Sequence, residues 1–135
     1  MLKLAVVAGA AAIALAGCNE SRPGAAQTSA LPHMSVAFNW CSGASPSFKI
    51  GQIPTGTKSL RLKLVDRDVP TWNHGGGDVQ VGGPTANVPC GAISGAYNGP
   101  NPPAGQVHTY EWTLTALDGS GAALAIGTAS KKYPQ

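Results

Sequence analysis

The sequence predicts an all-β protein, an antiparallel two-sheet sandwich with few or no helices, and three observations support this class. Two segments alternate apolar and polar residues with the period of a β-strand. After the first 17 residues, no segment shows a convincing helical period. The 135 residues include 18 glycines and 11 prolines, as a chain of strands joined by turns requires.

The N-terminal residues 1–17 are predicted to be the signal peptide of a bacterial lipoprotein. A short basic start is followed by residues 4–15, which contain no polar side chain and are too few to span a bilayer comfortably. The run Leu15-Ala16-Gly17-Cys18 then has the form of a lipobox, in which small residues precede the cysteine that carries lipid. The alternative is an ordinary signal peptide followed by an unrelated cysteine. Several acyl chains on Cys18 give lasting membrane attachment, whereas one chain binds only marginally.

Residues 18–33 are predicted to be a flexible tether, and residues 34–135 a single domain. The tether is rich in Ser, Gly, Ala, Pro and Gln and has no apolar period. Asn19 rather than Asp follows the lipobox cysteine, which favours the outer membrane, facing the periplasm. Without residues 1–17 the chain loses Lys3, so its net charge is 8 − 6 = +2, which is too small and too scattered for a nucleic-acid surface. We therefore expect a membrane-attached protein of the bacterial envelope with no nucleic-acid partner.

Two cysteines remain in the predicted domain, Cys41 and Cys90. Outside the cytoplasm two such thiols usually pair, so a Cys41–Cys90 disulfide is predicted, with free buried cysteines as the alternative. A zinc site is not expected, because no second Cys or His lies at ligand spacing from either cysteine.

Five strands are predicted in the domain. The segment 59–65 alternates well, with three leucines on one side and Arg61 and Lys63 on the other, so one face of this strand is buried. A turn at Asp118-Gly119-Ser120-Gly121 precedes the last strand. The five predicted strands are 36–40, 59–65, 78–81, 107–117 and 122–130.

The strand at 107–117 carries polar groups on its apolar face. Period two puts His108 and Tyr110 on the same face as Trp112 and Leu114. The two polar residues come at the start of the strand, where that face could open into a cavity.

A second polar group follows the strand at 59–65. Asp66 and Asp68 could bind a metal, act as acid and base, or order the turn. Pro70 fixes the backbone of this loop, and Trp72 supplies apolar surface that could form the wall of a pocket. His74 by itself is more often a structural histidine than a ligand.

The segment Gly99-Pro100-Asn101-Pro102-Pro103 must be a stiff loop, because its prolines remove the hydrogen-bond donors that a central strand needs. Residues before proline are restricted to extended conformations. Such a loop can form the rim of a binding site or serve as a rigid connector.

Taken in order, these motifs resemble the phosphatidylethanolamine-binding protein family, especially its bacterial Raf-kinase-inhibitor-like branch. Each motif is weak alone, but the ordered set spans about residues 38–118. Its elements are Cys41-Ser42-Gly43, Ser45-Pro46, Pro54 to Ser59, Asp66 to Pro70, His74, Gly99 to Pro103, His108 to Tyr110, and Ala116-Leu117-Asp118.

The resemblance implies a β-sandwich with a small anion pocket that accepts phosphate-like groups and phospholipid head groups. The bond that matches Val69–Pro70 is often cis in this family, so both isomers are open here. The sequence departs from the family pattern at Arg67, Gly75 to Gly77 and Thr109, which concern the rim of the pocket. The ligand-binding residues that the resemblance implies are Asp66, Pro70, His74, Pro102, His108 and Tyr110, with Asp68 a weaker candidate.

The leading interpretation is a lipid-anchored envelope protein that binds a small anionic ligand without catalysis, cofactor or metal. In it His74, His108 and Tyr110 donate hydrogen bonds to an anionic oxygen, while Asp66 orients an imidazole or accepts from an ammonium group. The alternative is a protein-interaction module, such as a protease inhibitor, that uses the glycine-rich 75–83 loop or the proline loop. An enzyme using the Asp/His pair ranks last, because the chain shows no recognisable nucleophile or metal set.

Overall fold

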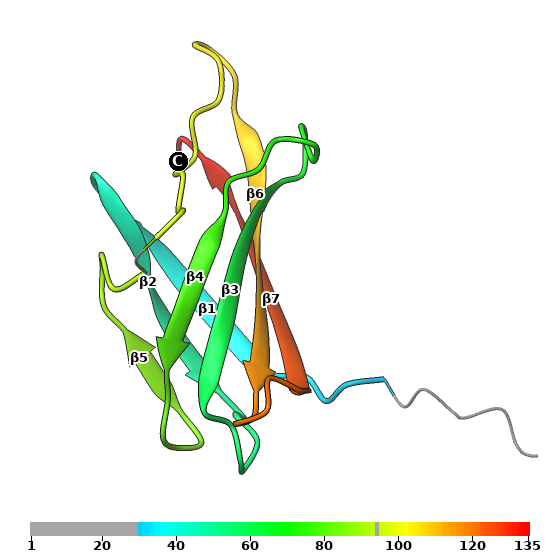
Figure 1. Ribbon diagram of the computed structural model, residues 1–135. Helices are drawn as coiled ribbons and strands as arrows, with labels where there is room; N and C mark the ends of the chain where they lie inside the picture. Colours follow the sequence, from blue (N-terminus) through cyan, green and yellow to red (C-terminus); the bar gives the residue numbers. More distant parts are fainter. Residues whose placement is uncertain (1–29, 94) are drawn as a thin grey trace, which may run out of the picture.

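The computed structural model describes residues 30–93 and 95–135, which fold into two antiparallel sheets (Figure 1). One sheet has the order β4-β3-β6-β7 and the other the order β1-β2-β5. The described residues contain no helix, so the predicted all-β sandwich is confirmed. The strands are β1 (Ser35–Cys41), β2 (Ala44–Gly51), β3 (Ser59–Asp66), β4 (Gly76–Gln80), β5 (Ala86–Val88), β6 (His108–Leu117) and β7 (Ala123–Tyr133).

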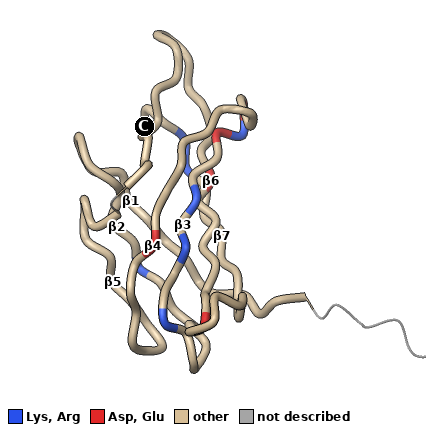
Figure 2. Tube along the Cα trace, viewed as in Figure 1, with Lys and Arg blue, Asp and Glu red and all other residues tan. Residues whose placement is uncertain are grey.

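The four-stranded sheet follows the alternation of the sequence. Strands β3 and β6 pair along the whole of β3, from Ser59 opposite Leu117 to Asp66 opposite Tyr110. Every second residue of both strands is buried, while Arg61 and Lys63 between them on β3 are exposed. Figure 2 shows the positive charges along β3. The predicted strands at 59–65 and 107–117 are therefore confirmed with the expected faces inward.

The core lies between the two sheets and is centred on aromatic side chains. Trp112 of β6 meets Phe48 of β2 edge to face, with ring centroids 5.2 Å apart, and Tyr97 stacks on it at 5.6 Å. Large aromatic side chains dominate the energetics of a core, and each such ring pair adds about 1 kcal/mol beyond its buried area. These contacts join the sheets and hold the 90–107 connection against the core.

Strands β2 and β5 were not predicted, because β2 contains Ser45-Pro46-Ser47 and β5 has three residues. Proline in a central strand normally removes a ladder bond. Here β2 is irregularly paired with β1 near Pro46, where the register shifts between Asn39 and Cys41, and β5 pairs only with Phe48 to Ile50. Pro46 therefore lies at the one part of β2 where its missing N–H can be tolerated.

A disulfide joins Cys41, at the end of β1, to Cys90, just after β5, with 6.0 Å between the Cα atoms. This confirms the predicted pairing. It ties the two edges of the three-stranded sheet together and closes a loop with a sequence separation of 49 residues.

The first described residues run along β7. The Ile126 N–H donates to the carbonyl oxygen of Pro32 (2.9 Å), and the Met34 N–H donates to that of Ile126 (2.8 Å). The last two residues of the predicted tether, Pro32 and His33, are thus part of the sheet's edge. The predicted signal peptide and Cys18 lie outside the described residues.

The described residues include no helix that is long and apolar enough to cross a membrane. The Val69–Pro70 bond is trans, since Tyr133–Pro134 is the only cis bond in the described part of the chain.

Candidate functional site

At one end of the sandwich the inward face of the four-stranded sheet changes from apolar to polar. Leu64 on β3 is followed inward by Asp66, and Trp112 on β6 is preceded inward by Tyr110 and His108. These polar residues line a cavity of about 300 Å³, together with His74 from the β3–β4 connection. Asp66, His74, His108 and Tyr110, which the sequence placed at one pocket, therefore come together.

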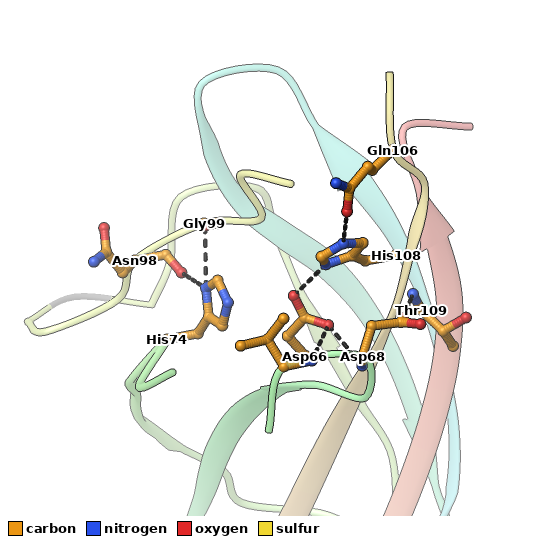
Figure 3. A network of polar contacts seen from close by, with 9 residues as sticks. Asp66, Asp68, His74, Asn98, Gly99, Gln106, His108 and Thr109 are labelled. Carbon is orange, nitrogen blue, oxygen red and sulfur yellow. Dashed lines mark hydrogen bonds and ion pairs between the residues drawn. The ribbon is translucent and has the colours of Figure 1, made fainter. Parts of the chain in front are cut away.

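Asp66 and His108 form a buried hydrogen-bonded pair (Figure 3). The His108 Nδ1–H donates to Asp66 Oδ2 over 2.6 Å, and the side chains are 8% and 5% exposed. Asp66 Oδ1 accepts from the backbone N–H groups of Asp68 (2.9 Å) and Val69 (3.2 Å). Burial alone would raise the pKa of Asp66, but the bonds from His108, Asp68 and Val69 outweigh it and lower the pKa. Asp66 is thus an ionised carboxylate that fixes the His108 ring.

The second ring nitrogen of His108 contacts Gln106, with Nε2 3.0 Å from Gln106 Oε1. The amide of Gln106 can satisfy either state of the ring, because it offers an oxygen to a protonated Nε2 and, turned over, an NH₂ group to an unprotonated one. Gln106 is exposed. A ligand that bonds to His108 Nε2 therefore competes with Gln106 for this nitrogen.

His74 is held in one orientation by the 95–99 segment. Its Nδ1 lies 2.9 Å from the carbonyl oxygen of Asn98 and 3.2 Å from that of Gly99. Carbonyl oxygens only accept, so Nδ1 carries the proton and Nε2 of the neutral ring is an acceptor. The Asn98 N–H in turn donates to the His74 carbonyl oxygen (2.8 Å). A neutral His74 therefore offers the cavity a lone pair, and a protonated His74 offers a donor.

Tyr110 lies between the two imidazoles. Its ring centroid is 5.3 Å from that of His74 and 6.3 Å from that of His108. Burial, and secondly the nearby charge of Asp66, raise the pKa of Tyr110 to about 12. The phenol therefore keeps its proton at neutral pH and serves as a hydrogen-bond donor.

Asp68 has a structural role in the loop. Its Oδ2 accepts from the Thr109 N–H (2.7 Å), and the Arg67 N–H donates to the Thr109 carbonyl oxygen (2.8 Å), which extends the β3–β6 ladder by one step. Asp66, Asp68 and His108 have ligand atoms within 4.8 Å of one another, as a metal site requires. Asp66 Oδ2 already bonds His108 Nδ1, and Asp68 Oδ2 already accepts from Thr109, so a metal that used these atoms would compete with those bonds.

Two predicted ligand residues, Pro70 and Pro102, do not line the cavity, contrary to the prediction that Pro102 borders it. In the proline loop Gly99, Asn101 and Pro103 line it instead. Residues before proline are extended, so neighbouring residues point to opposite sides. Pro100 accordingly lines a different cavity, beside the disulfide. Pro70 is exposed, whereas its neighbour Val69 faces the site.

Trp72 lines the cavity, as its predicted role as a wall requires. Two other residues of the site could not be predicted from the sequence pattern. Asn98 lines the cavity and Gln106 contacts His108, yet both belong to irregular segments in which no periodicity shows which side chain points inward.

The sequence matches the profile of the phosphatidylethanolamine-binding protein family over residues 21–133. The chain belongs to this family. The match covers every strand and every cavity residue described above. A search of curated proteins found no match.

Membership of the phosphatidylethanolamine-binding protein family suggests binding of a small ligand or of a protein. The family's name refers to a lipid with a phosphate and an ammonium group. The cavity brings together a protonated phenol and two imidazoles beside a carboxylate, and a phenol or an imidazole can donate to a phosphate oxygen.

Proposed function

We propose that this protein binds, without catalysis, a small ligand that carries a phosphate group, such as a phospholipid head group. The observation that carries the proposal is the convergence of His74, Tyr110 and His108 on one cavity of about 300 Å³. A cavity of this size lies at the lower end of the range for ligand sites. No cofactor or metal enters the proposal.

The fixed tautomer of His74 determines how a phosphate would bind. A phosphate oxygen without a proton can accept a hydrogen bond from Tyr110. The lone pair on Nε2 of neutral His74 would repel the same oxygen. Binding therefore requires one more proton, either on His74 Nε2 or on the phosphate itself. A charge-assisted bond to protonated His74 would be about twice as strong as a neutral one. Affinity should thus rise as the pH falls through the range in which histidines are protonated.

A monoester and a diester distinguish the two positions of that proton. Phosphoethanolamine can carry the proton on its own phosphate, whereas glycerophosphoethanolamine has no ionisable P–OH near neutral pH and requires it on His74. NMR titration of the imidazole resonances with both ligands between pH 5 and 8 tests the proposal. We expect His74 and His108 to shift with each ligand, with tighter binding at low pH.

Two variants serve as controls for this titration. His74→Ala should weaken binding of both ligands by at least about tenfold, as expected for loss of a charge-assisted bond. His33→Ala, at an exposed histidine far along β7, should leave affinity unchanged. If neither cavity histidine responds to either ligand, the binding proposal is wrong.

We also propose that the protein is attached to the bacterial envelope through lipidated Cys18, at the outer membrane facing the periplasm. The support is the lipobox Leu15-Ala16-Gly17-Cys18, together with a disulfide that suits an oxidising compartment. Cys18→Ser should release the protein from the membrane fraction or block its processing. If the variant fractionates and migrates like the unmodified protein, this part of the proposal fails.

A further inference from the structure

The exposed large apolar side chains of the described residues all lie at the end of the sandwich that holds the cavity. Val69 is 41% exposed, Trp72 is 60% exposed and Val107 is 56% exposed. Val69 and Trp72 belong to the β3–β4 connection, and Val107 directly precedes β6. The bond between Arg67 and Thr109 brings these two segments side by side. We call Val69, Trp72 and Val107 the apolar rim.

The segments that carry the apolar rim are uncharged over most of their length. Residues 69–77 and 95–107 contain no Asp, Glu, Lys or Arg. Figure 2 shows the loop that rises above β6 without a charged residue. The two segments also contain four prolines, which have no backbone N–H to desolvate. Those prolines are Pro70, Pro100, Pro102 and Pro103.

We propose that the apolar rim docks at the head-group level of a lipid bilayer and brings the cavity to the phosphates there. This inference rests on the proposed function, since it names the surface from which the ligand is taken. A bilayer presents a layer of phosphates directly above hydrocarbon, which matches a polar cavity bordered by apolar side chains. Tryptophan in particular favours this interface.

A protein partner fits the same surface less well. Protein interfaces usually contain about one hydrogen bond per 100–200 Å² and are enriched in arginine. Residues 69–77 and 95–107 offer no Asp, Glu, Lys or Arg side chain and have lost four backbone donors to proline. The charged residues just before them, Arg67 and Asp68, have opposite charges and are already bonded to Glu111 and to the Thr109 N–H. Their neutrality has a second consequence: docking requires no anionic lipid and is insensitive to salt, unlike attachment through a basic patch.

The test follows Trp72 in the full-length chain on vesicles of phosphatidylcholine whose acyl chains are brominated near the head group. Bromine quenches only indoles that reach it, so attachment through the N-terminal segment does not produce the signal. We expect quenching and a blue shift of emission, both unchanged in 1 M salt. The chain has three tryptophans, and Trp72→Phe should abolish the response because Trp40 is half-buried and Trp112 is buried.

Val107→Gln tests the rim without removing the reporter. Losing apolar contact at this position should weaken the Trp72 response at limiting lipid by about fivefold. Ala122→Gln, an exposed substitution in the turn before β7, is the matched control and should have no effect. If brominated lipid leaves Trp72 unquenched and acrylamide reaches it equally with and without vesicles, the inference is overturned and a protein-docking role takes its place.

The docking inference and the proposed function can fail separately. Val107 does not line the cavity, so Val107→Gln should leave the affinity for soluble phosphoethanolamine unchanged. Soluble binding without Trp72 quenching contradicts the docking inference alone. Quenching without any imidazole response to soluble ligand contradicts the proposed function and leaves the rim as a membrane contact.

Discussion

The two sheets of this protein differ in how the strands within each sheet are held together. In the four-stranded sheet β3 and β6 pair without interruption over the whole of β3, and inward and outward residues alternate as far as Ala116. In the three-stranded sheet β5 has three residues, β2 contains a proline, and a disulfide joins the two edges. The regular sheet also carries Asp66, His108 and Tyr110, which indicates that the site depends on its register.

The comparison shows how a continuous ladder can hold a polar site. Asp66 and Tyr110 are register partners, so the carboxylate, the phenol and the neighbouring imidazole are placed by backbone pairing. The three-stranded sheet mainly covers the core face of the other sheet. Phe48 packs against Trp112, and the disulfide holds the start of the segment that follows Cys90. We therefore expect changes in that sheet to alter stability more than ligand binding.

The largest effect should follow removal of the disulfide. In the chain-entropy model a bridge closing a loop of about 50 residues contributes about 4 kcal/mol. Cys41→Ser/Cys90→Ser should lower the free energy of unfolding by about that amount, measured by urea denaturation against the oxidised protein. The phosphoethanolamine affinity of the folded variant should change little. A loss of ligand binding in a variant that remains folded would contradict the division between the sheets.

A smaller effect is expected at Gly75, where the 95–99 segment crosses the entrance to β4. Gly75 has φ of +66°, and an added Cβ would lie 1.9 Å from the backbone oxygen of Ala96. Gly75→Ala should therefore destabilise the fold by about 3 kcal/mol. Gly82→Ala is the matched control, since nothing lies within 4 Å of its added Cβ. Equal thermal stability of the two variants would show that the crossing is not tight.

The smallest of the three effects concerns Asp66 and depends on pH. Because folding lowers the pKa of Asp66, its contribution is present above the unfolded pKa of about 3.9 and is lost as the pH falls through the folded pKa. Asp66→Asn should cost about 2 kcal/mol at pH 7. On acidification the variant should also lose less stability than the unmodified protein, because it has no carboxylate at position 66 to protonate.

Denaturation of Asp66→Asn at pH 7 and at pH 3 checks this linkage. Asp78→Asn provides the comparison, because Asp78 pairs with Arg61 on the exposed face of the sheet. If Asp66→Asn and the unmodified protein lose stability in parallel on acidification, Asp66 is not the group responsible.

How much the sequence could predict differs between the sheets for a physical reason. Alternation identified β3 and β6 and put His108 and Tyr110 on the inward face, because period two is a property of the backbone itself. It could not identify β2, since its Ser45-Pro46-Ser47 segment is tolerated only through an irregular pairing that depends on β1. The local sequence pattern does not predict a strand whose residues are tolerated only because of its pairing with a strand elsewhere in the chain.

The site shows the same division. The family motifs brought Asp66, His74, His108 and Tyr110 to one cavity, but in the proline loop they indicated Pro102 where Asn101 and Pro103 face inward. The orientation of the His74 ring was also out of reach, because two backbone carbonyls of the 95–99 segment determine it. Such contacts between loops cannot be predicted from the order of residues in the sequence.

The first described residues join the sandwich at the end opposite to the cavity. Pro32 and Met34 join β7 at Ile126, which lies opposite Thr115, whereas the cavity lies where β6 begins at His108 (Figure 1). Anything attached ahead of residue 30, whether an anchor, a tag or a solid support, thus meets the domain at the pole far from its opening. A label or support attached there therefore leaves the opening of the cavity free.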